Sequence, residues 1–132
     1  MERIELRTHE RAEMIDITPA VARAVARSGV RAGLCQVFVP HTTAGVTINE
    51  NTDPAVRQDI LYVLGALLPR TDPAYRHDEG NSAAHAASTL VGASQTIPVH
   101  EGRLEMGTWQ AVFFCEFDGP RQRQVWVQVI GR

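Results

Sequence analysis

The chain has 132 residues, of which 44% are hydrophobic and 21% are charged, enough for one globular domain (residues 1–132) with its own core. Lysine is absent, so the 13 basic residues are all arginine, and the 15 acidic residues give a formal net charge of −2. This balance excludes the strong positive field of a general nucleic-acid-binding protein and the high net charge of a disordered chain.

The sequence carries no sign of secretion or membrane insertion. Its first ten residues, MERIELRTHE, are charged and lack the apolar segment of a signal peptide. No apolar run reaches the ~18 residues of a membrane-spanning helix. Cys35 and Cys115 lie in separate apolar runs, which favours two buried thiols over a disulfide. We expect a cytoplasmic protein that binds neither nucleic acid nor membranes.

The N-terminal third alternates strands with one helix. Residues 2–8 alternate apolar and charged side chains, which predicts a strand. A helix opens at Thr18-Pro19, with Thr18 as its cap, and ends at Gly29. Residues 33–39 and 45–49 are predicted to be two further strands.

Two helices are expected in the middle of the chain. The longest begins at Asp53-Pro54 and ends before Pro69, and its apolar side chains recur at helical spacing in a wide stripe that we expect to be buried. A polar loop over residues 73–80 follows. An alanine-rich helix then begins at Asn81 or Ser82 and closes at Gly92.

The last third is predicted to be a β meander with strands over residues 95–99, 106–117 and 125–130, and with turns at Glu101-Gly102 and Asp118-Gly119-Pro120. The element order predicts an α+β fold. Its mixed, largely antiparallel sheet would close into a barrel or sandwich with two to three helices packed on it.

The first candidate site is the segment from His41 to Gly45, which directly follows a predicted buried strand. A strand end is a rigid platform from which a histidine can be aimed at a pocket. The hydroxyls of Thr42 and Thr43 suit an oxyanion or a polar ligand. The alternative interpretation is a turn in which His41 caps a backbone group.

The second candidate is a pair of histidines, His77 in the polar loop and His85 in the alanine-rich helix. Small neighbours leave the imidazole of His85 space but little packing. Together with His41 they could supply the three protein ligands of a catalytic zinc site, although the spacing matches no sharp zinc signature.

The third candidate comprises Glu50, Asn51 and Asp53, where a strand leads into a helix N-terminus. Asp53 already serves as the predicted helix cap. Polar residues of an ordinary turn are the alternative explanation for the other two.

The fourth candidate lies on the strand that follows Trp109 and Gln110. A period of two places Glu116 on an otherwise apolar face, so its carboxylate is either paired with an arginine or part of a site. Arg121 and Arg123 are the obvious partners, and a salt bridge is the favoured explanation. The same arginines could instead hold a phosphate.

The sequence lacks the residues that several classes of enzyme reaction require. The sequence contains no Gly-rich phosphate loop and no G-x-S-x-G nucleophile motif, and without lysine it cannot form a Schiff base. Any chemistry must come from histidine, carboxylates, hydroxyls, arginine or a metal held by them.

Three blocks of the sequence together resemble the YjbQ-like family, also called UPF0047 and labelled secondary thiamine-phosphate synthase. The first runs from His41 to Asn51 with Asp53 following, and the second contains His77, Asn81 and His85. The third combines Gly102-Arg103-Leu104, Gly107-Thr108-Trp109-Gln110 and Glu116-Phe117-Asp118-Gly119-Pro120-Arg121. The resemblance covers essentially the whole chain.

The resemblance implies an α+β domain that assembles as a homotrimer with a histidine-lined pocket. It also implies a weak thiamine-phosphate synthase activity, which joins a pyrimidine diphosphate to a thiazole phosphate. In this enzyme interpretation a divalent metal, with zinc the expected ion, is held by His41, His77 and His85. His41, Glu50 and Glu116 are the catalytic candidates. The ligand-binding candidates are Thr42, Thr43, Asn51, Asn81, Trp109, Gln110 and Arg121.

Two other interpretations remain open at this point. The same pocket could hold a metal or a small anionic or phosphorylated molecule without turnover, or the histidines could only lock the subunits of a trimer together. A physical argument also favours a trimer. The large apolar side chains of Trp109, Phe113, Trp126 and Ile130 are too many for one sheet to bury, so we expect some of them to face a neighbouring subunit.

Overall fold

The structure, a computed structural model, describes residues 1–132 as eight strands and three helices. The strands are β1 (Glu2–Arg7), β2 (Glu13–Asp16), β3 (Ala32–Phe38), β4 (Ala44–Glu50), β5 (Ser94–His100), β6 (Arg103–Leu104), β7 (Gln110–Glu116) and β8 (Gln122–Gly131). The helices are α1 (Thr18–Ser28), α2 (Pro54–Leu67) and α3 (Ser82–Val91). The predicted α+β class is confirmed.

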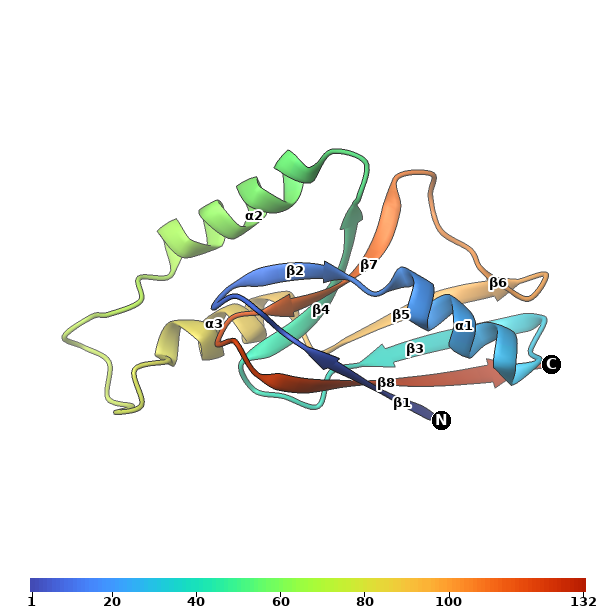
Figure 1. The fold of residues 1–132 in the computed structure, drawn as a ribbon, viewed down its shortest axis with the longest axis horizontal. Coiled ribbons are helices and arrows are strands. Elements are labelled where there is room, and N and C mark those ends of the chain that lie inside the picture. Colours follow the sequence, from blue (N-terminus) through green and yellow to red (C-terminus); the bar gives the residue numbers. More distant parts are fainter.

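The strands form two curled sheets rather than one closed barrel (Figure 1). The larger sheet has the order β1-β8-β3-β5-β6 and the smaller has the order β2-β7-β4. Every strand pairing is antiparallel, so the expected mixed character is absent. The sequence did not predict the short strand β2, since four residues are too few to show a clear alternation.

The chain passes between the two sheets three times at one end of the molecule. Residues 8–12 connect β1 to β2, residues 39–43 connect β3 to β4, and residues 117–121 connect β7 to β8. We call these three segments the crossover corner. Backbone hydrogen bonds tie them to one another: the amide of Phe117 donates to the carbonyl of Thr43 at 3.2 Å, and that of Gly119 donates to Arg11 at 3.0 Å.

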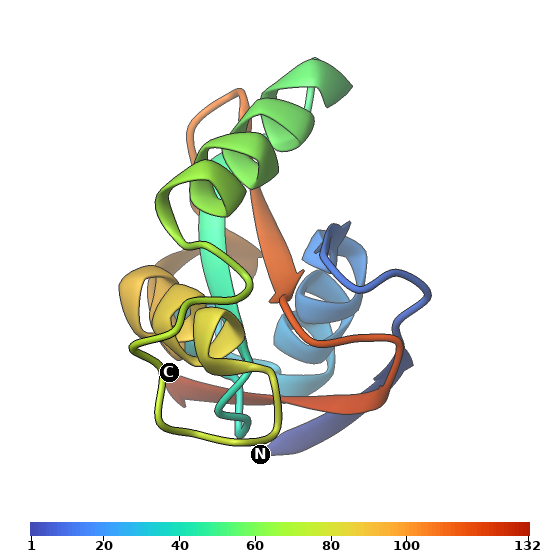
Figure 2. The same cartoon turned by 90° about the vertical axis from the view of Figure 1, so that its left-hand side faces the viewer.

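The smaller sheet is covered on both faces. Val46, Val112 and Phe114 face α1 and the inner face of the larger sheet in the main core. The opposite face of β7 contributes Phe113 and Cys115 to a second core with α3 and the inner side of α2. Figure 2 shows α2 and α3 together on this side of the molecule. The alternation predicted along β7 is therefore confirmed, and both of its faces are buried.

Two expectations about the helices need correction. Thr18 is the first residue of α1 rather than its cap, and its hydroxyl accepts a hydrogen bond from the amide of Val112 at 2.8 Å. The apolar stripe of α2 was expected to be buried, yet no residue of this helix is. Asp53 caps α2 as predicted, accepting from the amide of Ala55 at 2.9 Å. None of the helices has the length and apolar character needed to cross a bilayer.

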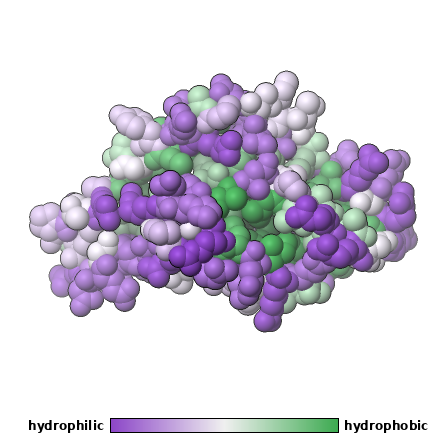
Figure 3. All heavy atoms as spheres, viewed as in Figure 1, coloured by the Kyte–Doolittle hydropathy of each residue, from purple (hydrophilic) through white to green (hydrophobic).

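Both cysteines are buried free thiols, as the sequence predicts. Burial raises the pKa of Cys35 to about 11 and that of Cys115 to about 12. Considerable apolar surface remains exposed, and Figure 3 shows it gathered near the middle of one face with hydrophilic surface around it.

Candidate functional site

A cleft of about 680 Å³ opens beside the crossover corner. Three stretches of chain that are distant in sequence line it: the crossover from β3 to β4, the loop that leads into α3, and the crossover from β7 to β8. The predicted site residues that line the cleft are His41, Thr42, Thr43, His77, Asn81, His85 and Arg121. The structure thus brings together seven of the candidates singled out from the sequence.

A buried ion pair lies beneath this cleft. The side chain of Glu116 is fully buried and that of Arg123 is 5% exposed, and the guanidinium donates to both carboxylate oxygens. The Thr8 hydroxyl donates to Oε2 of Glu116 at 2.8 Å, and the amide of Asp118 donates to Oε1 at 2.9 Å. The salt-bridge explanation for Glu116 is therefore confirmed, with Arg123 as its partner.

The electrostatics of Glu116 follow from these contacts. Burial by itself raises the pKa of the carboxyl, but the hydrogen bonds from Arg123, the Asp118 amide and Thr8 outweigh burial and lower the pKa. The carboxylate is ionised at neutral pH, and each of its oxygens accepts two hydrogen bonds. These are the contacts of a group that positions its neighbours, and the catalytic role suggested for Glu116 stays a prediction.

Arg123 also binds a residue in the wall of the cleft. Its Nη2 donates to the hydroxyl of Thr43 at 3.0 Å, which fixes the end of the crossover that carries His41. Thr8 thus supports the site from a fully buried position, whereas Arg123, with its side chain 5% exposed, also lines the cleft. No local pattern marks Thr8 in the sequence, because its partner Glu116 lies 108 residues away.

His41 is held in one protonation form. Its Nε2 accepts a hydrogen bond from the amide of Gln124 at 2.9 Å, so this nitrogen carries no proton and the neutral ring carries its proton on Nδ1. Burial lowers the pKa of His41, and the positive charge of Arg123 lowers it further. No protein group accepts from Nδ1, which leaves an N–H donor for a ligand.

His77 and His85 lie side by side, with ring centroids 5.4 Å apart and planes at 85°. Nε2 of His77 also lies 3.9 Å from a carboxylate oxygen of Glu79. The pair can supply two nitrogen ligands to a metal. However, no three His, Cys, Asp or Glu side chains of the chain are grouped as metal ligands. His41, His77 and His85 therefore share a cleft without forming the expected three-ligand group.

Asn81, Asp118 and Arg121 form the remaining wall. Nδ2 of Asn81 donates to Oδ2 of Asp118 at 2.9 Å, and Nη2 of Arg121 donates to the same oxygen at 2.9 Å. The Oδ1 atom of Asn81 is buried and has no hydrogen-bond partner. The Arg121 side chain is 52% exposed, so part of its guanidinium faces the cleft.

The catalytic candidate Glu50 and the remaining ligand-binding candidates lie elsewhere. Glu50 and Gln110 face each other across β4 and β7, and the amide of Asn51 donates to the carbonyl of Trp109 at 3.1 Å. This group sits at the end of β4 opposite to the cleft, roughly 20 Å away along a seven-residue strand. Within one chain, Glu50, Asn51, Trp109 and Gln110 do not line the cleft.

The comparisons with known proteins agree on one family. A sequence model of the family described as "UPF0047 protein YjbQ-like" matches residues 2–132. The UPF0047 protein MJ1081 of Methanocaldococcus jannaschii is 50% identical over 127 residues, which cover 96% of this chain and 91% of that relative. The UPF0047 protein YugU of Bacillus subtilis is 47% identical over 128 residues, which cover 97% of both chains.

Solved structures show the same fold. The crystal structure of an uncharacterised conserved protein of the yjbq/upf0047 family from Clostridium acetobutylicum superposes with a TM-score of 0.96 at 49% identity, covering 98% of this chain and 100% of that one. A structure from Sulfolobus solfataricus, described as a protein of unknown function, gives a TM-score of 0.95 at 35% identity over 99% of this chain and 96% of that one.

Proposed function

The chain belongs to the UPF0047 family of YjbQ-like proteins, and we propose that its cleft binds a small phosphorylated molecule and acts as a transferase of the thiamine-phosphate synthase type. In this reaction a pyrimidine diphosphate is joined to a thiazole phosphate. The observation that carries the proposal is the convergence of His41, the two threonines and Arg121 on one cleft.

These groups match the needs of a phosphate. Arg121 offers guanidinium N–H groups in the fork geometry that suits phosphate oxygens, and Asp118 holds this fork in place. The Nδ1–H of His41 and the exposed hydroxyl of Thr42 add neutral donors. The carboxylates of Asp118 and Glu79 also line the cleft, so a phosphate has to be steered to the Arg121 side.

The proposed reaction requires few catalytic groups from the protein. The thiazole nitrogen supplies the electron pair for the new carbon–nitrogen bond, and the diphosphate leaves with the electrons of the broken carbon–oxygen bond. The protein needs no nucleophile of its own. It has to hold both molecules in line and stabilise the leaving diphosphate, which are tasks for fixed N–H donors.

A divalent metal fits part of this arrangement. His77 and His85 would hold it, while the lone pair of His41 that could bind a metal is already committed to the Gln124 amide. When bound, the ion would supply positive charge to the leaving diphosphate. The zinc predicted from the sequence thus stays a proposal, with His77 and His85 as its protein ligands.

The test is the formation of thiamine phosphate from the two precursors, measured chromatographically with purified protein before and after metal removal. We expect Arg121→Gln and His85→Ala to lower turnover at least tenfold, whereas Arg23→Gln on the exposed surface of α1 leaves it unchanged. Turnover that is the same in all three variants would overturn the proposal.

Binding without turnover is the alternative, because the N–H and hydroxyl donors that would stabilise a leaving diphosphate would also hold a phosphorylated molecule that does not react. Calorimetric titration with inorganic diphosphate separates the two. Binding that depends on Arg121 in a protein that forms no product would support the alternative.

We also propose that the chain assembles as a homotrimer through the outer face of the larger sheet. Leu34 and Ile130 are 51% and 66% exposed and face each other across β3 and β8. Phe38, which is 40% exposed, and the half-buried Trp126 form a second aromatic pair, with ring centroids 5.8 Å apart, and Phe38 also lines the cleft. Phe113, in contrast, is fully buried and cannot contact a neighbouring subunit.

A neighbouring subunit would be the only way to bring Trp109 or Glu50 to a cleft. Light scattering at micromolar concentration tests the assembly, with Leu34→Gln/Ile130→Gln expected to give a monomer. A wild-type monomer would contradict it. Such an assembly would be cytoplasmic, where the two buried cysteines stay reduced.

A further inference from the structure

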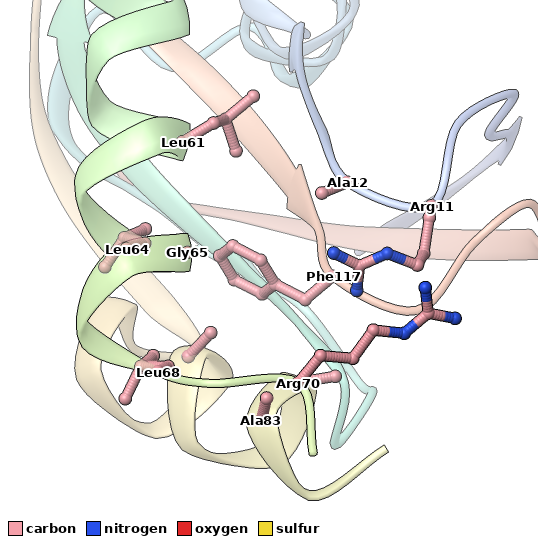
Figure 4. A pocket seen from close by; sticks show the side chains of 11 residues that line it. Arg11, Ala12, Leu61, Leu64, Gly65, Leu68, Arg70, Ala83 and Phe117 are labelled. Carbon is pink, nitrogen blue, oxygen red and sulfur yellow. The ribbon is translucent and has the colours of Figure 1, made fainter. Parts of the chain in front are cut away.

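A separate groove lies between α2 and α3, on the side of the smaller sheet away from the main core (Figure 4). Its volume is about 100 Å³, and it shares no lining residue with the cleft. Leu61, Leu64 and Leu68 of α2 form one side, Ala83 of α3 forms another, and the ring of Phe117 lies at the centre of the view. The groove is therefore lined mainly by apolar side chains.

Two arginines stand at this groove, Arg11 from the first crossover and Arg70 from the loop after α2. Neither forms an ion pair or donates a side-chain hydrogen bond within the chain. Asp118 is the one acidic residue that lines the groove or the small cavity beside it, and it is already bound to Arg121 and Asn81. Two like charges thus face the same apolar surface without a counter-ion.

We propose that this groove is a binding site for a small amphipathic carboxylate. The carboxylate would take N–H donors from Arg11 and Arg70, and its hydrocarbon tail would lie against Leu61, Leu64 and Phe117. Charge complementarity selects an anion, and the apolar lining selects a tail over a bare ion. A cavity of about 150 Å³ accommodates the six carbons of benzene, so the roughly 100 Å³ of this groove suits about four carbons of a longer tail.

Gly65 offers a way to close the groove without touching its charges. This residue lines the groove, and a Cβ built on it would meet no atom within 4 Å. A leucine at this position would project into open space on a helix, where leucine is more favourable than glycine. Gly65→Leu should therefore fill the groove while the protein stays folded.

The experiment is an NMR titration that follows the methyl groups of Leu61, Leu64 and Ala83 with four probes: hexanoate, acetate, hexan-1-ol and hexylamine. Each buried methylene strengthens binding roughly fourfold. With half of the tail buried, hexanoate should bind at least tenfold more tightly than acetate. It should also bind tenfold more tightly than the neutral alcohol, and hexylamine should be the weakest of the six-carbon probes.

The variants locate the interaction. We expect Arg11→Gln/Arg70→Gln to weaken hexanoate at least tenfold and Gly65→Leu to abolish its methyl shifts. Arg23→Gln and the cleft variant Arg121→Gln should bind like wild type. Equal affinity for hexanoate and acetate, or wild-type binding by Gly65→Leu, would overturn the proposal. So would methyl shifts that follow protein concentration without any probe, because a second copy of the chain would then cover the groove.

Discussion

Glu116 and Arg123 form an ion pair that is buried where the chain passes between its two sheets, with Nε of Arg123 donating to Oε2 of Glu116 at 2.8 Å. Thr8 from the first crossover binds the carboxylate, and Thr43 from the second binds the guanidinium. One pair of charges therefore holds all three segments of the crossover corner and the floor of the cleft.

Removing one member of this pair should destabilise the fold strongly. Glu116→Gln leaves the Arg123 charge buried without its counter-charge, and we expect a loss of about 3–5 kcal/mol in the free energy of unfolding at pH 7. The exposed Glu5→Gln on β1 is the matched control and should change stability by less than about 0.5 kcal/mol. Urea unfolding measures both values.

The same pair makes stability depend on pH. Because the pKa of Glu116 is lower in the folded state than its ordinary value of 4.5, its contribution is complete above pH 4.5 and is lost as the pH falls through the folded value. The difference in stability between wild type and Glu116→Gln should thus shrink between pH 5 and pH 3. A difference independent of pH across this range would contradict the assignment.

The tautomer of His41 predicts which variants disturb β8. His41→Ala removes the acceptor for the Gln124 amide, and hydrogen exchange of that amide should accelerate roughly fivefold, as for one lost hydrogen bond. His41→Gln can return an oxygen acceptor and should keep the slow exchange. Zinc binding, if present, should survive in His41→Ala and fail in His85→Ala, and the reverse order would refute the tautomer.

The two cysteines should be inert in the folded protein. Burial places their pKa values at about 11 and about 12, so hardly any thiolate exists at pH 8. Iodoacetamide at pH 8 should leave the native mass unchanged, whereas two adducts should form in urea. Rapid labelling of the native protein would show that Cys35 or Cys115 is reached without unfolding.

Gly119 is required by the close approach of two crossovers. A Cβ at this position would lie 2.3 Å from the carbonyl oxygen of Glu10 and 2.8 Å from the hydroxyl of Thr8. We expect Gly119→Ala to cost roughly 1–3 kcal/mol of stability, measured by thermal unfolding. Gly65→Ala, which meets open space on a helix, is the control and should stabilise by about 0.5–1 kcal/mol.

The sequence predicted most elements because their signals are local. Asp53 and Pro54 mark the start of α2, Gly29 ends α1, and the alternation along β7 identifies both of its buried faces. The burial of α2 was wrong because an apolar stripe indicates a contact face but not whether the same chain supplies the contact. The sequence left a barrel and a sandwich open and did not predict the strand order of the two sheets, since strand pairing is a long-range property.

The cleft was predictable where polar residues follow a strand or precede a helix, as His41 and Asn81 do. The role of Glu116 became clear only when Arg123 and Thr8 were placed around it in space. Glu50 and Trp109 show the opposite failure, because their place in a family motif says nothing about which end of a strand they occupy. A family motif thus groups residues in the sequence without showing that they meet in one site of a single chain.

Because of the crossover corner, a ligand in the cleft should stabilise the whole fold and not only its own binding site. A molecule that touches both the His41 segment and Arg121 bridges two of the three connections of the crossover corner, so its binding stabilises the two sheets against separation. Occupancy of the cleft should thus be visible as a higher midpoint of global unfolding. It should also slow exchange of amides in the centres of β3 and β7, far from the ligand itself.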